Sequence, residues 1–133
     1  MKGQIALITI LTDNVPALTR FYQDALGFSV KTDMGEYIEF ESEGVRFAVC
    51  ARSIMKSATG DPSFAENRAG QSFELAFPLD LPASVDEAYT EVVARGAKPI
   101  QPPATMPWGQ RTAFFSDPDG NIHELFAELP ATA

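Results

Sequence analysis

Apolar positions along the chain follow two spacings that alternate in a regular order. Short apolar or alternating stretches predict strands, whereas apolar positions three and four residues apart predict amphipathic helices. A strand is expected over residues 5–11. A helix follows, which Asp13 or Asn14 caps and Gly27 ends. Three further strands are expected over 28–32, 37–41 and 45–51.

The second half of the chain repeats this order. Phe73, Leu75 and Phe77 alternate with less apolar residues, which is typical of a half-buried strand. A helix is then predicted to begin at the capping box Ser84-Val85-Asp86-Glu87 and to end at Gly96. After it we expect a short strand over 98–101, an irregular proline-rich link over 102–106 and a final pair of strands.

Residues 53–70 break the pattern, because they are polar and show no sustained periodicity. So long a segment predicts a connecting loop or a lid over a site. The expected organisation is one domain over 1–133, with a first βαβββ module over 1–52 and a second over 71–130. Each helix has one apolar stripe, so both helices should cover the outer face of a mixed sheet and leave a cup on the other face. The fold class is α+β.

Composition narrows the class of partner. The formal charge of −8 argues against a nucleic-acid ligand. It would favour a cationic ligand, but a net negative charge also keeps soluble proteins apart, and the composition favours this second explanation. An apolar run long enough for a membrane span and a signal-type N-terminus are both missing from the sequence, so we expect a cytoplasmic protein without a membrane partner. Cys50 is the only cysteine, which excludes an intramolecular disulfide.

The final hairpin contains the most informative residues. Pro118 presets φ in the turn, Asp117 can accept backbone N–H groups, and Gly120 tolerates a positive φ. Glu124 follows inside an otherwise apolar strand over 122–129, where an ionised carboxylate is costly to bury. Its side chain therefore faces either water or a site.

Two motifs resemble those of a known family. Residues Phe21-Tyr22-Gln23-Asp24-Ala25-Leu26-Gly27-Phe28 resemble the "FY…LGF" helix end of the vicinal-oxygen-chelate superfamily, and Asp117-Pro118-Asp119-Gly120-Asn121 with Glu124-Leu125 resembles its "DPDGN…EL" hairpin. The superfamily includes glyoxalase I, extradiol dioxygenases, fosfomycin-resistance enzymes, methylmalonyl-CoA epimerase and bleomycin-resistance proteins. The resemblance implies paired βαβββ modules in an incomplete barrel, commonly dimeric, with the site in the cup.

In metal-dependent members, His, Glu or Gln residues from the first and last strands of each module hold a divalent ion such as Zn, Ni, Mn or Fe. The resemblance implies Glu74 and Glu124 as the ligands from the second module. In the first module Ala6 or Leu7 stands where a His is needed, and only Gln4 nearby offers an oxygen. The last-strand positions are Ala48, Cys50 and Arg52. We therefore expect an incomplete metal site and no resident cofactor.

Strand alternation assigns faces to these side chains. Glu74 points away from its apolar neighbours, and Glu124 points away from His123, so this histidine is a poor partner for Glu124 on one metal. Arg46 or Arg111 could instead neutralise the two carboxylates through bidentate contacts. The other residues that we expect at the ligand site are the aromatic Trp108 and Phe115, with Phe114 as the alternative to Phe115. Trp108 could equally well pack in the seam between two protomers.

Three functions remain open from the sequence. The first is a homodimeric small-molecule binding protein similar to bleomycin-resistance proteins, whose cup or dimer groove holds a cationic or aromatic ligand through Trp108, Phe115, Arg46, Glu74 and Glu124. The second is a metal-dependent lyase, isomerase or dioxygenase similar to glyoxalase, in which Glu74 and Glu124 bind metal and Glu124 moves a proton. The third is an accessory domain whose own side chains fill the cup. The sequence favours binding and leaves enzyme activity undecided.

Overall fold

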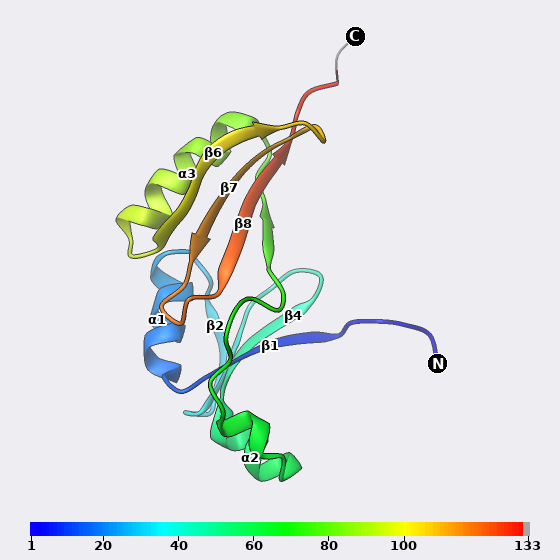
Figure 1. Cartoon of the computed structure of the whole chain (residues 1–133), viewed down its shortest axis with the longest axis vertical. Helices are drawn as coiled ribbons and strands as arrows, with labels where there is room; N and C mark the ends of the chain where they lie inside the picture. Colours follow the sequence, from blue (N-terminus) through cyan, green and yellow to red (C-terminus); the bar gives the residue numbers. More distant parts are fainter. Residues whose placement is uncertain (132–133) are drawn as a thin grey trace. The chain divides into compact units, whose positions relative to one another are not determined.

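A computed structural model describes residues 1–131 and divides the chain into two compact units, Met1–Ala69 and a second that begins at Gly70 (Figure 1). The single-domain prediction over 1–133 includes residues 132 and 133, which lie outside the described residues. Each unit has the order strand, helix, three strands, and each forms a four-stranded mixed sheet. The α+β prediction of doubled βαβββ modules is confirmed, and neither sheet closes into a barrel.

The first unit contains a sheet with strand order β1-β4-β3-β2. Strand β1 runs parallel to β4, and the other neighbours are antiparallel. Helix α1 packs against β3 and β4. The bounds are β1 (Leu7–Thr12), α1 (Val15–Asp24), β2 (Val30–Asp33), β3 (Tyr37–Phe40), β4 (Arg46–Ala51), α2 (Arg52–Thr59) and the 3-10 helix η1 (Pro62–Ala65).

Local signals explain both ends of α1. The Asn14 side chain caps the helix by accepting a hydrogen bond from the Ala17 amide at 3.1 Å. Gly27 has a φ of 76° and donates its amide to the Gln23 carbonyl at 3.1 Å, so it stops the helix as predicted. The buried stripe consists of Val15, Leu18, Phe21 and Tyr22.

An aromatic cluster forms the core beneath α1. The Tyr22 ring is fully buried, and its centroid lies 5.1 Å from that of Phe47 and 6.1 Å from that of Phe40. Phe28, just after Gly27, contacts the same two phenylalanines at 5.2 and 5.7 Å. The "FY…LGF" segment therefore supplies two rings to one cluster, Tyr22 from within α1 and Phe28 from just after its end.

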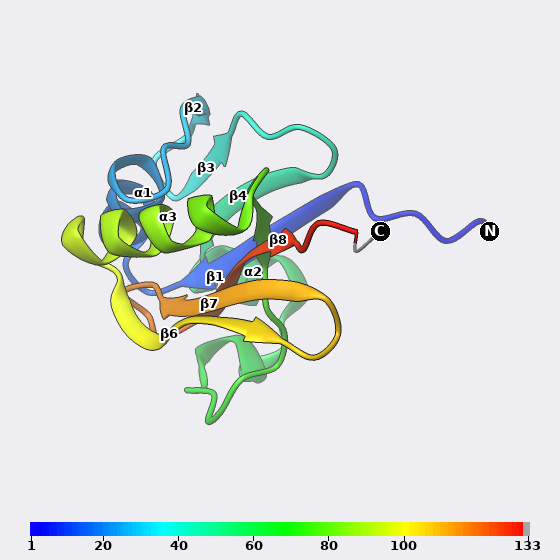
Figure 2. The ribbon, with the colours of Figure 1, turned by 90° about the horizontal axis from the view of Figure 1, so that it is seen from above.

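The second unit contains a sheet with strand order β5-β8-β7-β6, the same topology as the first. Strand β5 runs parallel to β8, and β8, β7 and β6 are antiparallel neighbours. Helix α3 lies along one face of the β6–β7–β8 sheet (Figure 2). The bounds are β5 (Ala76–Pro78), α3 (Pro82–Ala94), β6 (Lys98–Met106), β7 (Gln110–Ser116) and β8 (Ile122–Glu128).

Two predictions about local structure at the helices are wrong. Residues 53–70 were expected to lack regular structure, but they contain most of α2 and all of η1. Arg52 holds this segment in place by donating hydrogen bonds to the carbonyls of Phe64, at 3.0 Å, and of Glu66. The expected capping box is missing because α3 begins at Pro82, and the Ser84 amide donates instead to the Leu81 carbonyl.

The proline-rich segment after α3 also differs from its prediction. Strand β6 continues through residues 102–106, which we expected to be irregular. It is an edge strand whose pairing with β7 shifts register twice, and Pro102 and Pro103 lie within the second shift, where the ladder is irregular. Among residues 1–131, helices long and apolar enough to cross a membrane are absent.

Candidate functional site

The candidate site lies on the face of the second sheet that α3 leaves uncovered. In β8, His123, Leu125 and Ala127 are buried, whereas Ile122, Glu124 and Phe126 are partly exposed. The fully buried His123 ring contacts Phe77 and Phe115. The predicted alternation is therefore correct for β8, and Glu124 and His123 point to opposite faces.

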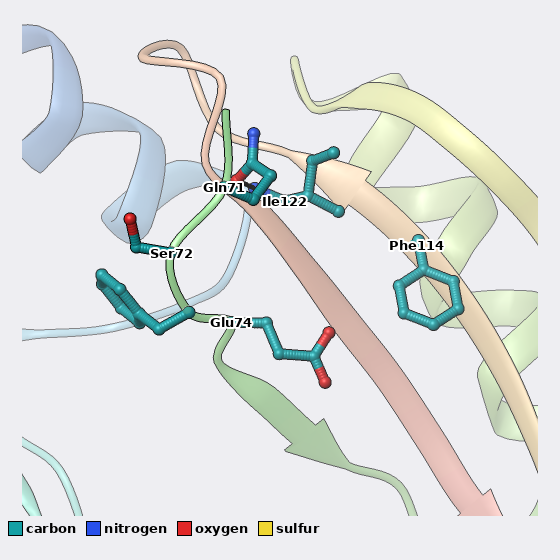
Figure 3. A pocket seen from close by; sticks show the side chains of 6 residues that line it. Gln71, Ser72, Glu74, Phe114 and Ile122 are labelled. Carbon is teal, nitrogen blue, oxygen red and sulfur yellow. Dashed lines mark hydrogen bonds between the residues drawn. The ribbon is translucent and has the colours of Figure 1, made fainter. Parts of the chain in front are cut away.

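Glu74 and Glu124 come together on this open face. Glu124 is the register partner of Ala76 in β5, and its amide donates to the Leu75 carbonyl at 2.9 Å. Glu74 precedes that position, and Figure 3 shows its side chain projecting across β8. The two carboxyl groups share a side-chain hydrogen bond. One of them must carry a proton to donate in such a contact.

This arrangement changes the acidity of Glu124. Burial raises the pKa of its carboxyl from 4.5 to about 7, and the hydrogen bond to Glu74 and the charge of Glu74 act in the same direction. Glu124 therefore changes between its protonated and ionised forms near neutral pH. A carboxyl with this property can accept or release a proton, and it can bind a cation that displaces the proton.

An open pocket of about 370 Å³ lies beside the carboxyl pair. Phe114 of β7 is the register partner of Glu124 and lines one side of the pocket. Ile122 of β8 lines the pocket as well (Figure 3). The pocket therefore combines a carboxylate with apolar and aromatic surface. Its lining residues are Gln71, Ser72, Phe73, Glu74, Phe114 and Ile122.

The turn before β8 fixes the start of this strand. The Asp117 carboxylate accepts the amides of Asp119 and Asn121, both at 3.0 Å, and the Asn121 side-chain amide at 2.8 Å. The Gly120 amide donates to the Asp117 carbonyl, with a φ of 86° at the glycine. The predicted turn is confirmed, and it sets the register that places Glu124 opposite Phe114.

The two arginines considered as partners for the carboxyl pair bind other acids. Arg46 makes a bidentate contact with Glu39, with Nε–Oε2 at 3.0 Å and Nη2–Oε1 at 2.6 Å. Arg111 makes a similar contact with Asp86 of α3, with Nη2–Oδ1 at 2.8 Å. The charge of Arg46 is therefore paired with Glu39 within the first unit, and its role at a ligand site stays a prediction. Arg111 lies on the face of its sheet that α3 covers.

Glu39 is a residue that sequence reasoning missed. It is 4% exposed, faces away from α1, and also accepts a hydrogen bond from the Tyr37 hydroxyl at 3.0 Å. The hydrogen bonds from Arg46 hold the pKa of Glu39 down to about 2, and the Tyr37 hydroxyl acts in the same direction while burial opposes both. The alternation of Tyr37 and Glu39 with the apolar Ile38 and Phe40 was the available signal.

This ion pair makes stability depend on pH. Because the Glu39 pKa is below its ordinary value of 4.5, its stabilising contribution is present above pH 4.5 and disappears as the pH falls towards 2. Arg46→Met should therefore lower the free energy of unfolding clearly at pH 7 and much less near pH 2.5, measured by urea denaturation. The exposed Arg20→Met is the matched control. An equal loss at both pH values would contradict this account of Arg46.

Three other predicted site residues lie elsewhere. Phe115 is fully buried beneath α3, so its prediction as a ligand contact is wrong, and the adjacent Phe114 takes that place. Trp108 is 63% exposed at the tip of the β6–β7 hairpin, where its Nε1 donates to Gln110 at 3.0 Å, and it does not line the pocket. Gln4 is exposed in the irregular segment before β1, in the first unit.

The fold implies a divalent metal, and the donor set allows a test of fit. Within the described residues, His, Cys, Asp and Glu side chains form no group of three or more that could hold an ion. Glu74 and Glu124 supply carboxyl oxygens from only two side chains, whereas catalytic zinc sites use three protein ligands. The residues on the open face do not fit a resident metal.

Comparison with known proteins identifies the family. The sequence profile of the Glyoxalase/Bleomycin resistance protein/Dioxygenase superfamily matches residues 4–125, so the chain belongs to this superfamily. The crystal structure of a glyoxalase/bleomycin resistance protein/dioxygenase from Nocardioides is 31% identical, with a TM-score of 0.87 over 99% of this chain and 87% of that one.

Two further proteins show how broad the similarity is. The protein YraH of Bacillus subtilis (strain 168) is 28% identical over 127 residues, which cover 92% of this chain and 96% of YraH. A lactoylglutathione lyase from Agrobacterium tumefaciens is 23% identical, with a TM-score of 0.73 over 96% of this chain and 95% of that one. At this identity the lyase shares the fold, which hosts unrelated chemistries.

Proposed function

We propose that the protein binds a small cationic molecule with an aromatic or apolar part in the pocket on the open face of the second sheet. The observation that carries the proposal is the Glu74–Glu124 carboxyl pair, which lies beside Phe114 and Ile122. The carboxyl pair offers charge to a cation, and the two apolar side chains offer surface to the rest of the ligand.

The charge of the site supports this proposal. Arg46 forms an ion pair with Glu39, and Arg111 forms one with Asp86. Among residues 1–131, neither Glu74 nor Glu124 takes part in an ion pair with a basic side chain. A ligand cation would therefore be the counter-charge that the carboxyl pair otherwise lacks. The formal net charge of −8 also favours the approach of such a ligand.

The pKa of Glu124 supports a second candidate function, in which the same carboxyl transfers a proton to or from a bound substrate. A general acid or base works best when its pKa lies near the working pH, and Glu124 has a pKa of about 7. Glu124 would be the catalytic group and Glu74 its hydrogen-bonding partner. This candidate uses no metal, because the open face does not supply the ligands that the metal-dependent lyases, isomerases and dioxygenases need. Homodimerisation and a cytoplasmic location stay predictions.

Calorimetric titration with benzamidine and benzamide tests the binding proposal. The two probes have nearly the same shape, but only benzamidine is cationic at neutral pH. We expect benzamidine to bind at pH 8 at least about tenfold more tightly than benzamide, the size of a charge-assisted hydrogen bond. Glu74→Gln should reduce this preference, and Glu87→Gln, on the exposed face of α3, should leave it unchanged. Equal binding of the two probes to the wild-type protein would refute the proposal.

A further inference from the structure

The segment that carries Glu74 is held at both ends by side chains. Residues 72–74, which we call the arch, lie between Gln71 and Leu75, and the ladder between β5 and β8 begins only at Ala76. Figure 3 shows the arch passing over the edge of the pocket. Glu74 is its last residue, so the conformation of the arch decides where that carboxyl lies.

Gln71 holds the first end of the arch to the final hairpin. Its side-chain Nε2 donates to the Gly120 carbonyl at 2.9 Å, and its Oε1 accepts the Ile122 amide at 3.1 Å. These two bonds join the side chain to the backbone on either side of Asn121, as a neighbouring strand would. Gln71 therefore attaches the arch where β8 begins.

His123 holds the second end. Its Nδ1 accepts the Leu75 amide at 3.2 Å, so the ring proton is on Nε2, which lies 3.7 Å from the Asp117 carboxylate. The ring is fully buried, and its centroid lies 6.1 Å from that of Phe77 and 5.9 Å from that of Phe115. Packing on both sides thus fixes the ring in the orientation that receives the Leu75 amide.

We propose that Gln71 and His123 are positioning residues that hold the arch in a preformed conformation and so keep the Glu74 carboxyl beside Glu124. Only three residues separate the two attachment points, which leaves the arch little conformational freedom. A site whose groups are fixed before the ligand arrives loses less entropy on binding. The inference rests on the proposed binding function and extends it to residues that do not themselves supply charge.

Substitution of Gln71 gives the first test, because its exposed side chain can change without disturbing the core. Gln71→Met keeps the length but removes both hydrogen bonds. We expect about tenfold weaker benzamidine binding, as two lost backbone contacts predict, and faster amide exchange at Ile122. The exposed Gln23→Met on α1 is the matched control and should change neither quantity.

Substitution of His123 gives the second test. In His123→Asn the side-chain oxygen can take the place of Nδ1, whereas His123→Leu has no acceptor. We expect amide exchange at Leu75 to accelerate at least about tenfold in His123→Leu and to stay closer to wild type in His123→Asn. The Ala127 amide, in the buried part of β8, reports global stability in both variants.

The ligand-free protein separates this inference from the binding proposal. The carboxyl carbon of Glu124 should shift in the NMR spectrum of Gln71→Met and of His123→Leu, because Glu74 moves away from it. That result supports the inference even when benzamidine fails to bind the wild-type protein. An unchanged Glu124 signal in both folded variants, or wild-type benzamidine affinity in Gln71→Met, would overturn it.

Discussion

Glu124→Gln is expected to weaken benzamidine binding about tenfold to a hundredfold at pH 8, the range for loss of a charge-assisted hydrogen bond. The expected loss depends on pH, because burial raises the pKa of Glu124 to about 7. Below this value the wild-type carboxyl carries a proton and offers no charge. Wild-type affinity should therefore rise about tenfold between pH 6 and pH 8, whereas the affinity of Glu124→Gln should stay nearly constant.

The same substitution should make the protein more stable at high pH. A carboxyl whose pKa is raised on folding contributes its full stability below pH 4.5 and loses it as the pH rises through 7. Glu124→Gln cannot ionise, so it avoids that loss. We expect a gain of about 1 kcal/mol at pH 8, after allowing for partial exposure of the side chain to solvent. Glu87→Gln is the control, and an equal gain at pH 5 would show that the carboxyl charge is not its cause.

Phe40→Ala should cause the largest loss of stability. The Phe40 side chain is 1% exposed, and its ring centroid lies 5.4 Å from that of Phe47 and 5.7 Å from that of Phe28. Its removal leaves a cavity in the aromatic cluster beneath α1. We expect the free energy of unfolding, measured by urea denaturation, to fall by about 3–5 kcal/mol.

A phenylalanine on the surface provides the comparison. Phe73 is 52% exposed, so Phe73→Ala should change the free energy of unfolding by less than about 1 kcal/mol. Phe73 also lines the pocket, and its substitution should weaken benzamidine binding while leaving stability nearly unchanged. A loss below about 1 kcal/mol for Phe40→Ala would contradict the assignment of the aromatic cluster as the core of the first unit.

The elements that the sequence predicts well are those where several local signals agree. Helix α1 has a side-chain cap at Asn14, an apolar stripe and a terminating Gly27, and all three lie where expected. The start of α3 shows what happens when two signals compete. Ser84 and Glu87 have the residue types of a capping box, but Pro82 is already suited to the first helical turn and starts the helix earlier.

Helix α2 could not be predicted from its own residues. It buries no side chain, and its eight residues are too few to be stable alone. The contacts of Arg52 with the carbonyls of Phe64 and Glu66 connect it to η1, and contacts across so many residues leave no periodic pattern. The segment therefore looked like a loop in the sequence.

Only the part of the candidate site that depends on strand alternation was predictable from the sequence. A period of two residues was enough to place Glu124 and His123 on opposite faces of β8. The same period was wrong for Phe73 and Glu74, which precede β5 and both line the pocket. Choosing Phe114 rather than Phe115 required the β7–β8 register, which depends on how the Asp117 turn closes. The pairing of Arg46 with Glu39 likewise depends on the β3–β4 register, which composition does not reveal.

The most direct test of the central claim is to follow the Glu124 carboxyl carbon by NMR through a pH titration, first without ligand and then with saturating benzamidine. We predict a midpoint near pH 7 in the free protein, as burial and Glu74 dictate. Benzamidine should move the midpoint towards the ordinary value of 4.5, because a bound cation stabilises the ionised carboxyl. A midpoint that benzamidine leaves unchanged would show that the Glu74–Glu124 pair does not bind cations.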